Sequence, residues 1–74
     1  MRQAIQTTYK GPTNYRGARV IARCDAGRVV VPWDHAIGVG ENHEAAARAL
    51  ASKLGWAWDH VGGGIGNGYV WVAP

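Results

Sequence analysis

Apolar and polar residues alternate along several stretches of the chain with the period of two that is typical of strands. In residues 3–9, Ile5, Thr7 and Tyr9 fall on one face of the predicted strand. Residues 18–24 and 28–33 alternate in the same way, and residues 69–72 form a further short run. A turn segment separates the second stretch from the third, so these two predict a hairpin.

We expect the tip of this hairpin at Ala26–Gly27, because glycine accepts the positive φ that tight turns require. Pairing residues outward from this tip places six mostly apolar side chains on one face. That predicted core face consists of Val20, Ala22, Cys24, Val29, Val31 and Trp33. Cys24 is therefore expected to be a small buried hydrophobic residue and not a nucleophile.

Residues 45–54 are the one stretch with strong helix propensity. Asn42 suits the N-cap position, and Gly55 suits the position after the last helical residue. Glu44 and Arg48 are spaced for an i,i+4 ion pair. The predicted buried stripe consists of Ala46, Ala47, Leu50, Ala51 and Leu54.

These elements predict a single α+β domain over residues 1–74. The expected order is β-β-β-α-β, in an antiparallel sheet of about four strands with one helix packed on one face. A short extra strand near Trp58 is compatible with the pattern. The glycine-rich segment 62–68 is expected to be a flexible connection before the last strand.

Composition excludes several classes of protein. One cysteine, Cys24, cannot form an internal disulfide framework or a cysteine zinc site. No apolar run approaches the roughly 20 residues of a membrane span, and residues 1–4 do not begin an apolar signal-peptide core. The net charge of +3 describes a mildly basic chain, which we expect to be intracellular.

No catalytic, cofactor or metal motif is apparent. No lysine follows the glycines as in a phosphate-binding loop, and the dinucleotide pattern fails because its third glycine position is Asn67. The histidines His35, His43 and His60 have no mutual spacing of metal ligands on one helix. We therefore expect no enzyme activity, no cofactor and no metal.

Basic residues are concentrated in the first part of the chain, on the loop before the hairpin and on the hairpin itself. We expect a partner-binding surface formed by Arg16, Arg19, Arg23 and Arg28, with Tyr15 and Trp71 as neighbours. Arginine, tryptophan and tyrosine together suit either a protein–protein hot spot or phosphate contact combined with base stacking.

The predicted register also offers an ordinary structural role for two of these arginines. It pairs Arg28 with Asp25 and Arg19 with Asp34, as cross-strand ion pairs. Arg23 faces Val30 in this register and has no acidic partner.

Several segments resemble a family of small proteins from phages and mobile elements of proteobacteria. They are residues 4–14 and 16–19, 31–36, 41–43, 53–56, 61–64 and 68–72, among which Gly-Pro-Thr-Asn and Gly-Gly-Gly are the most distinctive. The size, the arginine content and the lack of an active site also resemble small anti-CRISPR proteins that bind type I Cascade complexes. This second likeness is one of class and carries over no residue.

The resemblance implies a non-enzymatic phage or prophage inhibitor in the cytoplasm of a bacterial host. We expect it to bind a type I CRISPR surveillance complex, at a protein subunit or its nucleic-acid path, and to block target DNA binding. The alternative is a small basic nucleic-acid-binding regulatory protein of a phage or plasmid. The sequence also allows a weak homodimer through the sheet face or an edge, and no membrane partner is expected.

Overall fold

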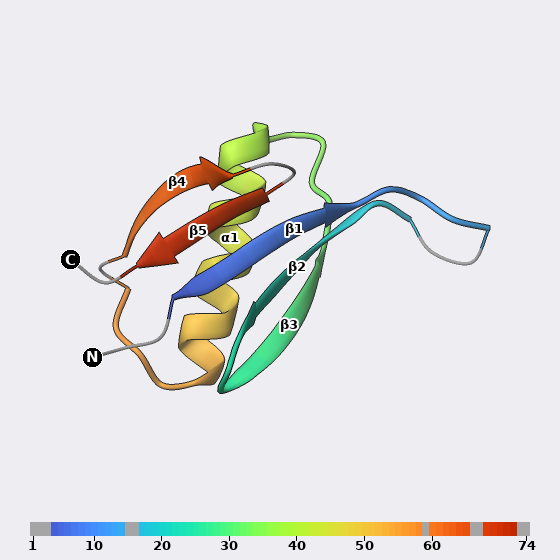
Figure 1. Ribbon diagram of the computed structural model, residues 1–74. Helices are drawn as coiled ribbons and strands as arrows, with labels where there is room; N and C mark the ends of the chain where they lie inside the picture. The colour runs from blue at the N-terminus through green and yellow to red at the C-terminus, as the bar shows by residue number, and fades with distance from the viewer. Residues whose placement is uncertain (1–3, 15–16, 59, 66–67, 73–74) are drawn as a thin grey trace.

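One helix and five strands make up the computed structural model, which describes residues 4–14, 17–58, 60–65 and 68–72. In chain order the elements are β1 (Ile5–Lys10), β2 (Arg19–Cys24), β3 (Gly27–Pro32), α1 (Val39–Lys53), β4 (Val61–Ile65) and β5 (Gly68–Val72). All strand pairs are antiparallel, in the order β3-β2-β1-β5-β4. The helix lies against one face of this sheet (Figure 1).

The predicted α+β class with one helix on an antiparallel sheet is confirmed, but the sheet has five strands where about four were expected. The additional strand is β4, whose sequence is Val-Gly-Gly-Gly-Ile. Three consecutive glycines carry no side chains, so no alternating pattern marks this segment as a strand. Backbone pairing with β5 defines β4 as a strand, in the register Val61↔Val72 and Gly63↔Val70.

The hairpin of β2 and β3 turns one residue earlier than predicted, at Asp25–Ala26, with Cys24 opposite Gly27. The prediction placed Gly27 in the turn because glycine accepts positive φ, but the observed turn uses none, and Gly27 begins β3 instead. Among the described residues no non-glycine residue has positive φ. This shift moves each partner by two positions, so every side chain keeps its predicted face.

The core lies between the helix and the sheet. Residues of the predicted core face and of the predicted helix stripe meet there, because small alanine side chains let the helix approach the sheet closely. The buried apolar side chains are Ile5, Val20, Ala22, Ala46, Ala47, Leu50, Ala51 and Trp71. Cys24, Val29, Val31, Trp33 and Leu54 are partly buried and pack against this cluster.

The helix begins earlier than expected, with Gly38 and not Asn42 as its N-cap residue. Asn42 is instead buried in the first turn and holds the loop that connects β3 to α1. Its amide group donates to the carbonyl oxygens of Asp34 at 2.9 Å and Gly38 at 3.0 Å. Its Oδ1 accepts the N–H of Asp34 at 2.8 Å, so one side chain satisfies several backbone groups of the loop.

The predicted end of the helix is confirmed. Gly55 has φ of 76°, and its N–H donates to the carbonyl of Ser52 at 3.1 Å. The N–H of Trp56 donates to the carbonyl of Ala51 at 2.8 Å. These two bonds form a Schellman motif, for which glycine is the preferred left-handed residue. The predicted Glu44–Arg48 pair on the helix is also present, at 3.5 Å.

The sheet has two edges, β3 and β4. Arg28 and Pro32 lie on β3, and charge and proline are common means of limiting pairing at an edge. β4 carries neither. The homodimer allowed by the sequence remains a prediction.

In the described part of the chain, no helix has both the length and the apolar character to cross a membrane.

Candidate functional site

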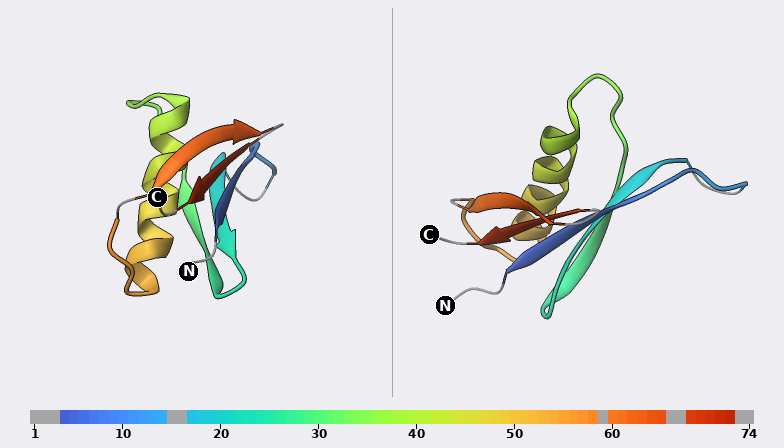
Figure 2. Two further views of the ribbon diagram at one scale, coloured as in Figure 1. Left: turned by 60° about the vertical axis from the view of Figure 1, so that its left-hand side comes forward. Right: turned by 45° about the horizontal axis from the view of Figure 1, so that its top comes forward.

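The face of the sheet opposite the helix is covered by no element of the described chain. Figure 1 looks onto this face, and the first view of Figure 2 shows the helix on the other side alone. Alternate residues of each strand point to this face. It is therefore the part of the fold on which polar and charged side chains gather without a structural layer above them.

Three rows of side chains cross this face over β1, β2 and β3. In register they are Gln6–Arg23–Arg28, Thr8–Ile21–Val30 and Lys10–Arg19–Pro32. We call the four cations Lys10, Arg19, Arg23 and Arg28 together the basic face. No carboxylate belongs to β1, β2 or β3.

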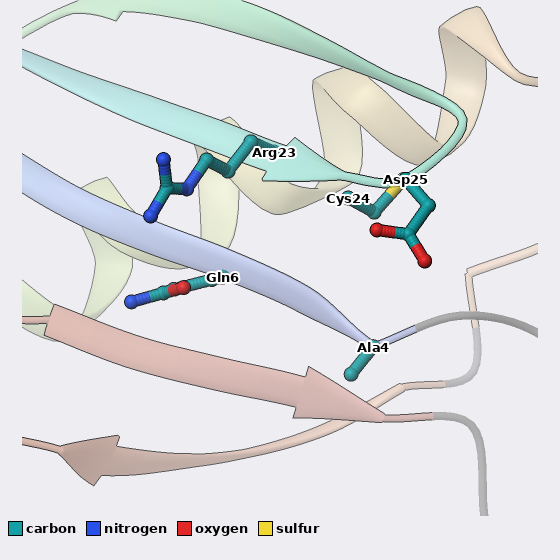
Figure 3. A pocket seen from close by; sticks show the side chains of 5 residues that line it. All are labelled: Ala4, Gln6, Arg23, Cys24 and Asp25. Atoms are coloured by element: carbon teal, nitrogen blue, oxygen red, sulfur yellow. The ribbon is translucent and has the colours of Figure 1, made fainter.

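Arg23 and Arg28 lie directly opposite each other on β2 and β3. The predicted Asp25–Arg28 pair is wrong, because the turn itself contains Asp25. Like charges at directly opposite positions, with Cβ atoms about 4.5–5.5 Å apart, destabilise a sheet. Within the described residues, neither guanidinium has a carboxylate within ion-pair distance. Figure 3 shows the side chain of Arg23 extending alongside Gln6 and away from Asp25.

Arg19 is the most confined of the four cations. Its Nη1 donates to the carbonyl of Gly17 at 3.5 Å, and its Nε is buried without a hydrogen-bond partner. The predicted pair with Asp34 is not formed, since Pro32 lies opposite Arg19 in the observed register. Asp34 Oδ1 instead accepts the N–H of Ala36 at 2.9 Å.

Two hollows lie beside the cations. The first, of about 540 Å³, is lined by Ala4, Gln6, Arg23, Cys24 and Asp25 (Figure 3). The second, of about 500 Å³, is lined by Gly17, Ala18, Arg19, Arg28, Val30 and Pro32. Three of the four cations therefore line concave parts of the surface.

Trp71 does not belong to this face, which corrects the sequence-based expectation. It pairs with Ile5 on the helix side of the sheet and is only 8 % exposed. Its ring lies 5.8 Å from that of Trp58 and 5.9 Å from that of Tyr69, measured between centroids. Of the other predicted site residues, Tyr15 and Arg16 lie outside the described residues.

A buried polar cluster on the helix side was missed by the sequence analysis. The hydroxyl oxygen of Thr7 lies 2.8 Å from Nδ1 of His43 and accepts the indole N–H of Trp71 at 3.1 Å. Thr7 and His43 are both at most 2 % exposed. The available signal was Thr7 itself, a hydroxyl residue on the same predicted strand face as Ile5, since buried hydroxyls are hydrogen-bonded.

Burial lowers the pKa of His43 from its usual value of 6.5, and a hydrogen bond with the backbone of Thr7 acts in the opposite direction. The neutral imidazole is therefore favoured in the folded protein. Nδ1 lies 2.8 Å from the Thr7 hydroxyl, and the tautomer of the neutral ring sets which of the two donates. This cluster stabilises the interface between sheet and helix and is not exposed to a ligand.

We expect the protein to be less stable at about pH 5.5 than at pH 7.5. His43 binds a proton more readily in the unfolded chain, so stability falls as the pH drops through the unfolded pKa of 6.5 toward the lower folded pKa. Urea unfolding at several pH values measures this effect. His43→Gln is expected to flatten the dependence, whereas His35→Gln, at an exposed position, should leave it intact. An unfolding midpoint in the unmodified protein that is the same at both pH values would contradict the prediction.

No group of three or more His, Cys, Asp or Glu side chains that could hold a metal occurs among the described residues. Comparison of the chain with protein-family models, with the curated proteins and with the solved structures gave no match.

Proposed function

We propose that this protein binds nucleic acid through its basic face, by contact with backbone phosphates. The observation that carries the proposal is the directly opposed pair Arg23 and Arg28, two exposed cations without an acidic partner among the described residues. Placing them together costs folding free energy, and an anion bound between them would offset the repulsion. The guanidinium group matches phosphate in geometry and charge.

The position of Trp71 favours phosphate contact over the other uses considered for this surface. Base stacking and protein hot spots both depend on exposed aromatic rings. The residues that point from β1, β2 and β3 to the open face include none. What remains is positive charge without exposed aromatic rings, which supports binding that depends little on base sequence.

Filter binding of a labelled DNA across a series of salt concentrations tests this function. If all four cations contact phosphates, the slope of log K against log salt should be near −3.6, at roughly 0.9 per contact. Binding at low salt that weakens steeply as salt rises is the expected result. No binding of DNA or RNA at low salt would overturn the proposed function.

Reversing one charge of the opposed pair separates binding from folding. Arg23→Glu should weaken DNA binding at least 10-fold, because repulsion is added to a lost contact. The same change places a carboxylate opposite Arg28, so stability to urea should be unchanged or slightly higher. Arg48→Glu is the control with the same change in charge, on α1, where Arg48 pairs with Glu44 and lies outside the basic face. Equal loss of binding in both variants would contradict a site on the basic face.

A second candidate is the inhibition of a host nucleoprotein machine, such as a type I CRISPR surveillance complex. The observation in its favour is an apolar component of the same open face, where Val30, Val61 and Val72 are 43–60 % exposed. Such side chains add little to phosphate contact but can pack against a protein. Co-purification with a Cascade complex that persists at high salt, and loss of target DNA binding by that complex, would support this candidate.

A further inference from the structure

The four cations of the basic face are not scattered but form two separate rows. Arg23 and Arg28 form one row, and Lys10 and Arg19 form the other, each pair lying on neighbouring strands. Arg19 and Arg23 are four residues apart on β2, which corresponds to about 13 Å along a strand. Between them lies the uncharged row of Thr8, Ile21 and Val30.

A single-stranded nucleic acid presents one line of phosphates, and proteins that bind it follow this line with a continuous basic groove and aromatic platforms. The open face offers neither feature on β1, β2 and β3. A duplex instead presents two lines of phosphates on either side of a groove. Two cationic rows with an uncharged row between them match that second arrangement.

The spacing of the rows favours the narrower groove of B-form DNA. The minor groove is roughly 6 Å wide between its walls, which is about 12 Å between phosphate lines when the phosphate groups forming those walls are included. The rows are about 13 Å apart at the backbone, and flexible lysine and arginine side chains adjust by a few ångströms. The major groove is roughly twice as wide, at about 12 Å between walls.

We propose that the basic face straddles the minor groove of duplex DNA, with each cationic row on the phosphates of a different strand. This inference rests on the proposed nucleic-acid binding and adds the form of the ligand and its orientation. Thr8, Ile21 and Val30 then lie over the groove. They supply only one hydroxyl for hydrogen bonding to bases, so the contact is largely independent of sequence.

Competition with groove-specific ligands on an A·T-rich duplex tests the orientation. Methyl green, which occupies the major groove, should leave the protein bound. Distamycin, which occupies the minor groove, should displace the protein, and the duplex should bind at least 10-fold more tightly than either of its single strands. Displacement of the protein by methyl green, or binding unaffected by distamycin, would overturn the proposal.

Two double variants test the assignment of the rows. Arg23→Ala with Arg28→Ala, and Lys10→Ala with Arg19→Ala, should each reduce the salt slope by about 1.8, at roughly 0.9 per lost contact. A single strand bound as tightly as the duplex would overturn the minor-groove inference but leave nucleic-acid binding intact. Absence of all nucleic-acid binding removes both proposals.

Discussion

Replacing Thr7 by valine is expected to lower the free energy of unfolding by about 2–4 kcal/mol, although the two side chains are nearly the same size. The variant loses the hydroxyl that lies between His43 and Trp71 in the core. A buried polar group left without its partner costs roughly 1–3 kcal/mol, and two such groups are affected here. A domain of 74 residues has about 4–11 kcal/mol of stability in total, at roughly 0.05–0.15 kcal/mol per residue.

Thr8→Val is the matched control for this experiment. Thr8 is the next residue of β1 and lies on the opposite, open face, where its side chain is only partly buried. The same substitution there should change stability by about 0.5 kcal/mol or less. Urea unfolding followed by circular dichroism measures both variants, and equal effects at the two positions would show that the buried cluster contributes nothing.

The second large effect is expected at Gly62 on β4, which faces Trp71 across the β4–β5 pair. A Cβ atom added at this position would overlap the indole ring of Trp71. Gly62→Ala must therefore displace a core side chain that is also hydrogen-bonded to Thr7. Overpacking of this kind costs roughly 1–3 kcal/mol, and loss of the indole hydrogen bond would bring the total to about 3 kcal/mol.

Gly63→Ala provides the comparison at the adjacent residue. No heavy atom lies within 4 Å of a Cβ built there. Alanine restricts the unfolded chain more than glycine does, so this variant should be more stable by about 0.4–1 kcal/mol. The two neighbouring substitutions are thus expected to have opposite signs in the same thermal or urea measurement. Destabilisation of similar size by both would show that overlap with the indole of Trp71 is not the cause.

The faces of the β2–β3 hairpin were predictable from sequence even though its register was not. A shift of two positions leaves the alternation unchanged, so Val20 and Ala22 remain in the core and Arg19 and Arg23 remain on the open face. The ion pairs were wrong for the same reason. Cross-strand partners depend on the exact turn, and the observed turn at Asp25–Ala26 does not use the positive φ for which Gly27 was assigned to it.

The position of Trp71 could not be derived from the alternation within β5. Residues 69–72 read Tyr-Val-Trp-Val, so both faces of this strand are apolar and either could face the helix. Pairing with β1 decides between them, because Trp71 lies opposite Ile5 and Tyr69 lies opposite Thr7. The local sequence pattern does not reveal such non-local pairing. Because of it, Trp71, one of the six predicted site residues, does not lie on the candidate surface.

The placement of the tryptophans has a practical consequence for spectroscopy. Trp71 is in the core, and Trp33, Trp56 and Trp58 pack against it, so the described chain places every indole away from the basic face. Tryptophan emission therefore reports on the separation of helix and sheet. Neighbouring rings quench this emission in the folded protein, and unfolding relieves the quenching. A ligand docked on the open face would leave that emission almost unchanged. In a titration, tryptophan fluorescence would then show no change even when the ligand is bound. A dye attached to the ligand is the appropriate probe.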